Sequence, residues 1–380
     1  MPLNLIYIFA DQLRYHSCGF AGDPHAHTPN MDRLAFESTN CLNAISNTPV
    51  CAAYRASLFT GKHQSSHGMV INELRLSPDH ECFGHVLGSA GYETSYIGKW
   101  HLWANELGNH RAVRNAFTPP GPYRLGFDGY WAGYNFSHHS YQGVYFEDTC
   151  EPRRYEGYEA DVQTEMAIER ISTHAASESP FALFLSWGPP HDPWGQDNVR
   201  PEDWERFKDA DIPHRPTVTL AQDGYADSWA TMDETYRDRL DDNVRGYYAQ
   251  TANIDWNLGR ILDAIDAAGI RDNTILVFTS YHGEMFGAQG RRAKNIFYDE
   301  AAHVPLLIRQ PSVQASTVET CISTVDLMPT LLGLLDLASP ESVEGTNLST
   351  TVSGRSPDVD HCVTMQGMGT TAAWRDGHEW

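Results

Sequence analysis

Short apolar runs alternate with longer amphipathic stretches along this chain, and that alternation limits the folds it can adopt. Residues 3–10, 181–187 and 274–279 form apolar runs with the length and composition of buried strands. Amphipathic stretches at 158–176 and 241–268 have the length of helices, and Gly269 suits the end of the second one. Strands that alternate with helices predict an α/β fold with a largely parallel sheet covered by helices on both faces.

The remaining elements follow the same order. Strands are expected at 40–46, 92–98 and 304–309, and helices from Pro29, from Cys51, at 80–90 and at 325–337. Two segments, 102–154 and 188–237, are rich in Gly, Pro, aromatic and charged residues and are expected to be functional loops. Aromatic residues between 117 and 146 suit either stacking on a substrate or a satellite core under the loop.

Composition excludes several classes of protein. The chain has 380 residues, enough for one large domain or two smaller ones, and a formal net charge of −22. That charge argues against nucleic acid or an anionic membrane as a partner. The seven cysteines show no paired spacing, so neither a disulfide framework nor a structural zinc site is expected. The first apolar run lacks a basic flank and is too short to span a bilayer, which predicts a cytoplasmic protein without a signal peptide.

Polar side chains follow each predicted strand. In an open α/β sheet such residues gather beyond the carboxyl ends of the strands, where ligands bind. Any one of these groups alone suits an ordinary loop, but their recurrence predicts an active site at this edge of the sheet. The groups are Asp11 and Gln12, Lys99 and His101, His191, and Tyr281 and His282.

Cys51 begins a helix-compatible run in which Arg55 follows four residues later. Residues four apart share one face of a helix, and a helix N-terminus attracts anions. The run therefore suits a nucleophile beside a guanidinium at an anion site. A buried structural cysteine before an ordinary helix is the alternative interpretation.

The chain resembles the type I, formylglycine-dependent sulfatases of the alkaline phosphatase superfamily. The run from Cys51 to Gly61 is similar to the family signature C-x-P-S-R followed by T-G. Residues 98–101 read G-K-W-H, residues 190–193 read P-H-D-P, and residues 279–284 read T-S-Y-H-G-E, each like a family motif in the family's order. The resemblance covers about residues 4–345. It implies a large mixed, mostly parallel sheet sandwiched by helices, with a catalytic domain at 1–345 and the start of an incomplete C-terminal subdomain at 346–380.

The resemblance also implies roles for individual residues. Cys51 would be converted to formylglycine by a maturase, and its hydrate would attack the sulfur of a small-molecule or carbohydrate sulfate ester. The metal would be Ca²⁺, with Mn²⁺ or Mg²⁺ as alternatives, and its ligands would come from the positions of Asp11, Gln12, Cys51, Tyr281 and His282. In the same scheme Arg55 orients the hydrate, Lys99 and Lys294 bind sulfate oxygens, His191 protonates the leaving oxygen and His101 lies nearer the nucleophile. Because Lys294 follows two arginines, a solvated basic surface is the alternative for it.

Three features depart from the family pattern. Tyr281 stands where the family has a metal-binding aspartate, and Ala53 stands where the signature has proline, which suits maturation by a radical enzyme. The chain also stops inside what resembles a hairpin. Two other functions therefore stay open: a phosphonate monoester or phosphodiester hydrolase of the same superfamily, and a degenerate relative that binds anions without turnover.

Overall fold

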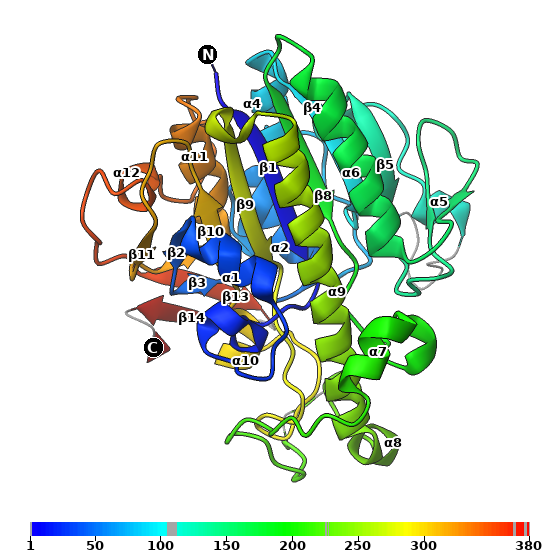
Figure 1. The fold of residues 1–380 in the computed structure, drawn as a ribbon. Coiled ribbons are helices and arrows are strands. Elements are labelled where there is room, and N and C mark those ends of the chain that lie inside the picture. Colours follow the sequence, from blue (N-terminus) through cyan, green and yellow to red (C-terminus); the bar gives the residue numbers. More distant parts are fainter. Residues whose placement is uncertain are drawn as a thin grey trace.

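An eight-stranded sheet forms the centre of the computed structural model, which describes residues 2–104, 112–224, 226, 228–367, 370–375 and 378–379 (Figure 1). The strand order is β11-β2-β10-β9-β1-β8-β4-β5. β1 lies between β8 and β9, parallel to both, and β4 is parallel to β8 and β5. β10 runs antiparallel to β9 and β2. The predicted mixed, mostly parallel α/β sheet is therefore confirmed.

The strands of this sheet have the following bounds: β1 Asn4–Ala10, β2 Thr39–Cys41, β4 Glu93–Lys99, β5 Tyr130–Tyr134, β8 Phe181–Ser186, β9 Thr274–Ser280, β10 Leu306–Arg309 and β11 Ser316–Val318. Smaller sheets are formed by β3 Ala44–Ile45, β6 Val144–Tyr145, β7 Arg153–Arg154, β12 Ile322–Ser323, β13 Val363–Gly367, β14 Thr370–Arg375 and β15 His378–Glu379.

Two apolar layers hold helices against the sheet, because side chains of β1 alternate between its faces. Ile6 and Ile8 pack in one cluster with residues of α1 (Pro29–Phe36), α6 (Glu159–Ala175) and α9 (Leu240–Ala267). Tyr7 and Phe9 pack in the other cluster with α2 (Cys51–Thr60), α4 (Phe83–Ser89) and α11 (Thr324–Leu334). The shorter helices are α3 Gln64–His67, α5 Val113–Ala116, α7 Pro201–Phe207, α8 Glu234–Asp238, α10 Asp299–Ala302 and α12 Ser349–Val352.

Three details differ from the sequence-based expectation. The strand expected at 40–46 is two short strands, β2 and β3, in different sheets. The segment 102–154, expected as a loop, contributes the edge strand β5 to the main sheet. Its aromatic residues Trp131, Tyr134 and Tyr145 are buried, which favours the satellite core over a substrate-stacking surface.

Residues 346–365 pack onto the main body of the molecule. Val352 lies in the same apolar cluster as β1, and its carbonyl accepts from Thr39 Oγ1 at 2.8 Å. Val363 and Met365 pack with Ile45 of β3. The predicted boundary at residue 345 therefore falls within a continuous core.

Candidate active site

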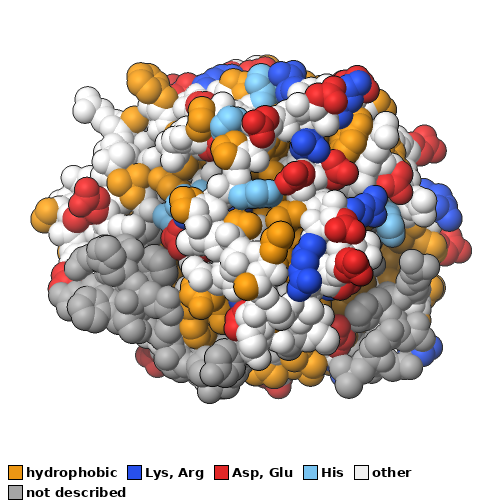
Figure 2. All heavy atoms as spheres, turned by 90° about the horizontal axis from the view of Figure 1, so that it is seen from below, with side chains coloured by type: hydrophobic (Ala, Val, Ile, Leu, Met, Phe, Trp, Pro, Cys, Tyr) orange, Lys and Arg blue, Asp and Glu red, His pale blue; other side chains and the backbone are white. Residues whose placement is uncertain are grey.

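The polar residues predicted from the strand ends meet below the carboxyl ends of β1, β4, β8 and β9. In Figure 1 these strands end in the lower part of the molecule, and Figure 2 views that lower face, where acidic, basic and histidine side chains are interspersed. The centre of the site is closed: Asp11, Lys99 and His282 are fully buried, and Cys51 is 1% exposed.

Cys51 is the first residue of α2 and lies against two potential metal ligands. Its sulfur is 3.2 Å from His282 Nε2 and 3.7 Å from Asp11 Oδ1. Burial alone would raise the pKa of the Cys51 thiol, but Lys294 and Lys99, followed by His282 and His101, hold it well below its ordinary value. The free N–H groups of the first turn of α2 add to this anion-stabilising environment. Position 51 therefore lies where a nucleophilic or anionic group is stabilised.

Asp11 and Lys99 form a fully buried ion pair, with Lys99 Nζ 2.6 Å from Asp11 Oδ2. Burial and Cys51 raise the pKa of Asp11, yet Lys99, His191 and Lys294 bring it below its ordinary value. The carboxylate is therefore ionised, and its second oxygen, Oδ1, lies 3.4 Å from His282 Nε2.

The basic run around Lys294 allowed it to lie on a solvated surface, and that alternative is wrong. Its side chain is buried, and Nζ donates to Gln12 Oε1 at 2.6 Å. Nζ also lies 2.6 Å from His191 Nε2, and because an ammonium group can only donate, the ring nitrogen accepts from it. Burial and Lys294 lower the pKa of His191, but Asp192 and Asp11 raise it to about 9.

Arg55 lies beside Tyr281 rather than against the nucleophile. Its guanidinium donates to Tyr96 Oη and to Ser186 Oγ, both at 2.8 Å, and also to the Lys99 carbonyl and the Tyr281 hydroxyl. It stacks over the Tyr281 ring at 4.2 Å. Arg55 thus ties the ends of β4 and β8 together, and its direct action on a hydrate stays a prediction.

The Tyr281 hydroxyl binds Arg55 and the end of β8. The hydroxyl lies 2.5 Å from Ser186 Oγ and 3.4 Å from the Trp187 carbonyl, in addition to its bond with Arg55. Burial, the largest influence, raises the pKa of Tyr281 well above 10, so the phenol is neutral. A neutral phenol is a weaker ligand than a carboxylate, and the metal role of Tyr281 stays a prediction.

Asp11, Gln12 and His282 fit a divalent cation. Asp11 Oδ1 and His282 Nε2 are close enough for one ion to contact both, and the amide oxygen of Gln12 faces the same group of cations as Asp11. With one carboxylate, one amide and one imidazole, the set is mixed rather than all-oxygen. The identity of the ion, Ca²⁺ or alternatively Mn²⁺ or Mg²⁺, stays a prediction.

Two histidines complete the site. His101 lies next to Cys51, which raises its pKa, but burial is the larger influence and lowers that pKa to about 4. His138, in the segment 102–154 that the sequence predicts to be a loop, stacks on His191 at 3.9 Å. Its only sequence signal is that it follows β5, a strand that the sequence did not reveal.

Backbone strain also concentrates at this site. Gln12, His101, Ala293 and Asn295 have φ angles of 70°, 55°, 63° and 68°, a region that residues other than glycine rarely adopt. These residues include or flank the polar groups that converge on Cys51. Such conformations cost of order 1–3 kcal/mol each and are found mainly where a functional geometry requires them.

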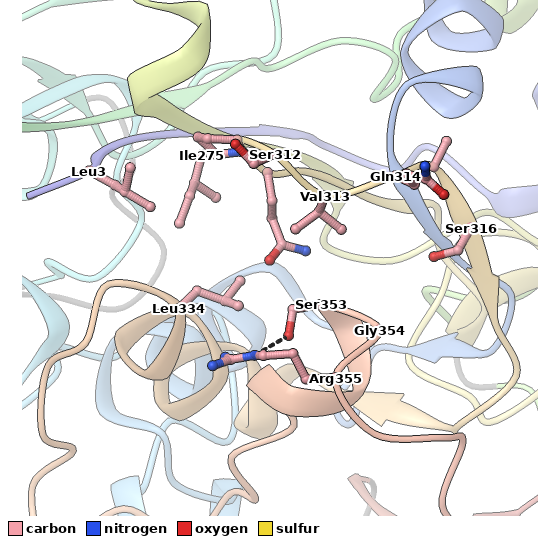
Figure 3. A pocket seen from close by; sticks show the side chains of 13 residues that line it. Leu3, Ile275, Ser312, Val313, Gln314, Ser316, Leu334, Ser353, Gly354 and Arg355 are labelled. Atoms are coloured by element: carbon pink, nitrogen blue, oxygen red, sulfur yellow. Dashed lines mark hydrogen bonds between the residues drawn. The ribbon is translucent and has the colours of Figure 1, made fainter.

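A separate hollow of about 630 Å³ lies at the opposite edge of the sheet (Figure 3). It is lined by Leu3 and Ile275 from the start of two strands, and by Ser353 and Arg355, which are joined by a 2.8 Å hydrogen bond. This hollow contains none of the residues predicted for catalysis and is not part of the candidate site.

Comparison with known proteins agrees with this geometry. The family model for Sulfatase matches residues 3–337. The chain is 35% identical to an ulvan-active sulfatase of Formosa agariphila over 94% of this chain and 66% of that protein, and thus spans just under two thirds of its length. It is 26% identical to the N-acetylglucosamine-6-O-sulfatase of Bacteroides thetaiotaomicron, with 91% and 70% covered.

Solved structures share the fold. The crystal structure of yidJ from Bacteroides fragilis superposes with a TM-score of 0.88 at 29% identity, covering 99% of this chain and 84% of that one. A phosphonate monoester hydrolase of Agrobacterium radiobacter has a TM-score of 0.72 at 21% identity, covering 99% and 88%. The second likeness shows only that the fold is common to both.

Proposed function

The chain belongs to the sulfatase family, and on that basis we propose that it hydrolyses sulfate monoesters of carbohydrates at the site around Cys51. The observation that carries the proposal is the placement of Cys51 at the start of α2, 3.2 Å from His282 and close to the buried ammonium groups of Lys99 and Lys294. A sulfate ester is an anion and needs such a cluster, because the overall charge of −22 would repel it.

The orientation of the bound sulfate ester follows from which residues of the site are exposed. Position 51 is the buried end of the site, whereas the His191 side chain is 10% exposed and the neighbouring Asp192 side chain is 56% exposed. A sulfate ester therefore enters with its sulfur toward position 51 and its alcohol toward His191. Lys99 and Lys294 hold the sulfate oxygens, and the proton that Lys294 Nζ donates to His191 Nε2 passes through that ring nitrogen to the leaving oxygen.

The proposal also requires two groups that are not ordinary side chains, a formylglycine and a divalent metal ion. Formylglycine at position 51, made by a maturase, supplies a hydrated aldehyde as the nucleophile. A divalent ion held by Asp11, Gln12 and His282 supplies a Lewis acid for the sulfate.

A carbohydrate is the substrate class that we favour. Trp229 lies over Lys294 Nζ at 5.5 Å and its side chain is 40% exposed, so its ring borders the outer part of the site. An aromatic face next to a sulfate-binding cation suits a sulfated sugar ring. Sulfatases named for carbohydrate substrates are also among the relatives of the chain.

The first test is the mass of the peptide that contains Cys51, from protein made alone and with a formylglycine-generating maturase. The expected result is the cysteine-to-aldehyde mass change, together with turnover of 6-O-sulfated N-acetylglucosamine that is absent in Cys51→Ala. Unmodified Cys51 under both conditions would contradict the formylglycine mechanism.

The second test compares substrates of the same shape. Faster turnover of an aryl phosphonate than of the matching aryl sulfate would assign the chain to phosphonate hydrolysis. Sulfate binding with no turnover of either ester, in protein shown to carry the aldehyde, would indicate the anion-binding relative that Tyr281 suggests.

A further inference from the structure

We propose that His16, Asp299 and His303 form a second metal site, for a borderline divalent ion such as Zn²⁺, outside the candidate active site. One ligand atom from each residue lies within 4.8 Å of the other two. His16 Nε2 contacts Asp299 Oδ2, and His303 Nδ1 lies 3.0 Å from Asp299 Oδ1. Two imidazoles and one carboxylate are a donor set that Zn²⁺ takes in proteins.

The tautomer of His303 supports this assignment. His303 Nε2 is 2.8 Å from the Leu42 carbonyl, which can only accept, so Nε2 carries a proton. In the neutral ring Nδ1 then presents a lone pair to a carboxylate oxygen that also only accepts. A cation bound by both of these atoms would remove the repulsion between their lone pairs. A histidine that donates one nitrogen to a backbone carbonyl and offers the other to a metal is the usual arrangement at metal sites.

The surroundings fix the ring and leave room for water. Tyr15 stacks on the His303 ring at 4.1 Å with an interplanar angle of 8°. The side chains of His16, Asp299 and His303 are 24%, 33% and 10% exposed. The group is therefore partly buried but open on one side, so that water can complete a tetrahedral shell around an ion with three protein ligands.

The alternative is a salt bridge in which both histidines are protonated. Asp299 already has a nearby cation, because Arg215 Nη2 lies 3.5 Å from Oδ2. Two imidazolium ions and one divalent ion bring the same charge to this carboxylate, so the number of bound ions decides between the two arrangements.

The group of His16, Asp299 and His303 lies where a bound ion would join two segments of the chain. His16 lies shortly after Gln12, and Asp299 begins α10, shortly after Lys294. A bound ion would link the segment that carries Gln12 to the segment that carries Lys294. These segments are already joined by a backbone hydrogen bond of 3.1 Å from Tyr15 to His303. We expect it to stabilise the folded chain without contacting substrate.

The test counts Zn²⁺ ions bound per chain after gel filtration, in the parent chain and in His16→Gln. The expected result is one ion fewer in the variant, with loss of one Co²⁺ absorption component and of part of the Zn²⁺-dependent rise in Tm. His214→Gln is the matched control, because His214 pairs with Asp241 at 2.7 Å on the surface and, among the described residues, no third donor forms a metal-binding group with them. That control should bind as many ions as the parent.

His16 is half-buried, so His16→Gln should keep the fold, which far-UV circular dichroism checks. Equal numbers of bound ions in the parent and in folded His16→Gln, including none in both, would overturn the proposal. A loss of one ion in His214→Gln as well would also overturn it, because the effect would then belong to surface histidines in general.

Discussion

At the scale of single residues, the site combines family-like groups with one substitution that changes their partners. Tyr281 brings a neutral phenol to a position where a carboxylate would add negative charge beside Arg55 and Asp11. The aromatic ring instead packs against Phe9 at 5.0 Å and Tyr54 at 5.5 Å. The site thereby keeps its cations but has one anionic ligand fewer for a metal.

We therefore expect Tyr281→Asp to tighten Mn²⁺ binding at least tenfold, a gain of about 1.4 kcal/mol, and to raise metal-dependent sulfatase activity. The same change removes a buried ring and should lower the free energy of unfolding by about 3 kcal/mol. Isothermal titration calorimetry measures the affinity, with Tyr281→Phe as the control that adds no charge. Unchanged affinity in Tyr281→Asp would contradict this account.

Glu159 predicts a pH dependence of stability. Burial, only partly offset by hydrogen bonds from Tyr134 and Gln163, raises its pKa from 4.5 to about 7. Between these values the unfolded chain releases a proton that the folded chain keeps, so stability falls as the pH rises from 4.5 through 7.

Glu159→Gln should remove this slope and make the chain more stable than the parent at pH 8 by about 2 kcal/mol, judged from about 1.4 kcal/mol per pKa unit with allowance for a weaker hydrogen bond. Urea unfolding across pH 4.5 to 8 measures it. Glu169→Gln, an exposed position on the same helix, should leave the profile unchanged. A parent-like slope in Glu159→Gln would exclude this carboxyl as the cause.

At the scale of elements, the strand ends determine where the catalytic side chains lie. β4 delivers Lys99 only because Gly98 allows it to pass close to β8. Gly98 has φ of +100°, and a Cβ atom there would lie 2.0 Å from the Ser186 carbonyl oxygen. The contact is with backbone, so no side-chain movement relieves it.

Gly98→Ala should therefore destabilise the chain by about 3 kcal/mol or more and displace Lys99. Gly91→Ala is a matched control, since φ there is +84° but no atom lies within 4 Å of its Cβ position. It should cost only the left-handed backbone energy of about 1–2 kcal/mol. Urea unfolding and sulfatase assays measure both, and equal effects in the two variants would refute the close-approach argument.

At the scale of the whole molecule, residues 346–365 pack onto the core that the sheet and its helices form. Leu348, Val352, Val363 and Met365 are all buried. The backbone N–H of Gln366 also donates to the Asn47 carbonyl at 2.8 Å. In the part of the chain that the structure describes, no helix is both long and apolar enough to cross a membrane.

A chain that ends at residue 345 should consequently be less stable than the full chain and bind an apolar dye. Burying one such side chain is worth about 1.5–3 kcal/mol, and this truncation removes four. A chain that ends at residue 367 retains all four and serves as the control. Equal thermal stability of the 1–345 chain and the full chain would instead support the separate domain that the sequence suggested.

The sequence by itself determined the main strands, the long helices and the order in which polar groups follow the strands. Those features depend on local periodicity and on motifs a few residues long. It did not show β5, whose five residues include Gly133 and lie in a segment rich in loop formers. Consequently His138 could not be placed beside His191.

Only the tertiary structure decided which groups are partners. Lys99 pairs with Asp11 across 88 residues, and the hydroxyl of Tyr281 binds Arg55 across 226 residues. Such contacts depend on how strands stack in the sheet and on which side chains are desolvated together, and neither is encoded in a local pattern. The sequence thus identified the chemical groups of the site, whereas packing determined their charges, hydrogen bonds and distances.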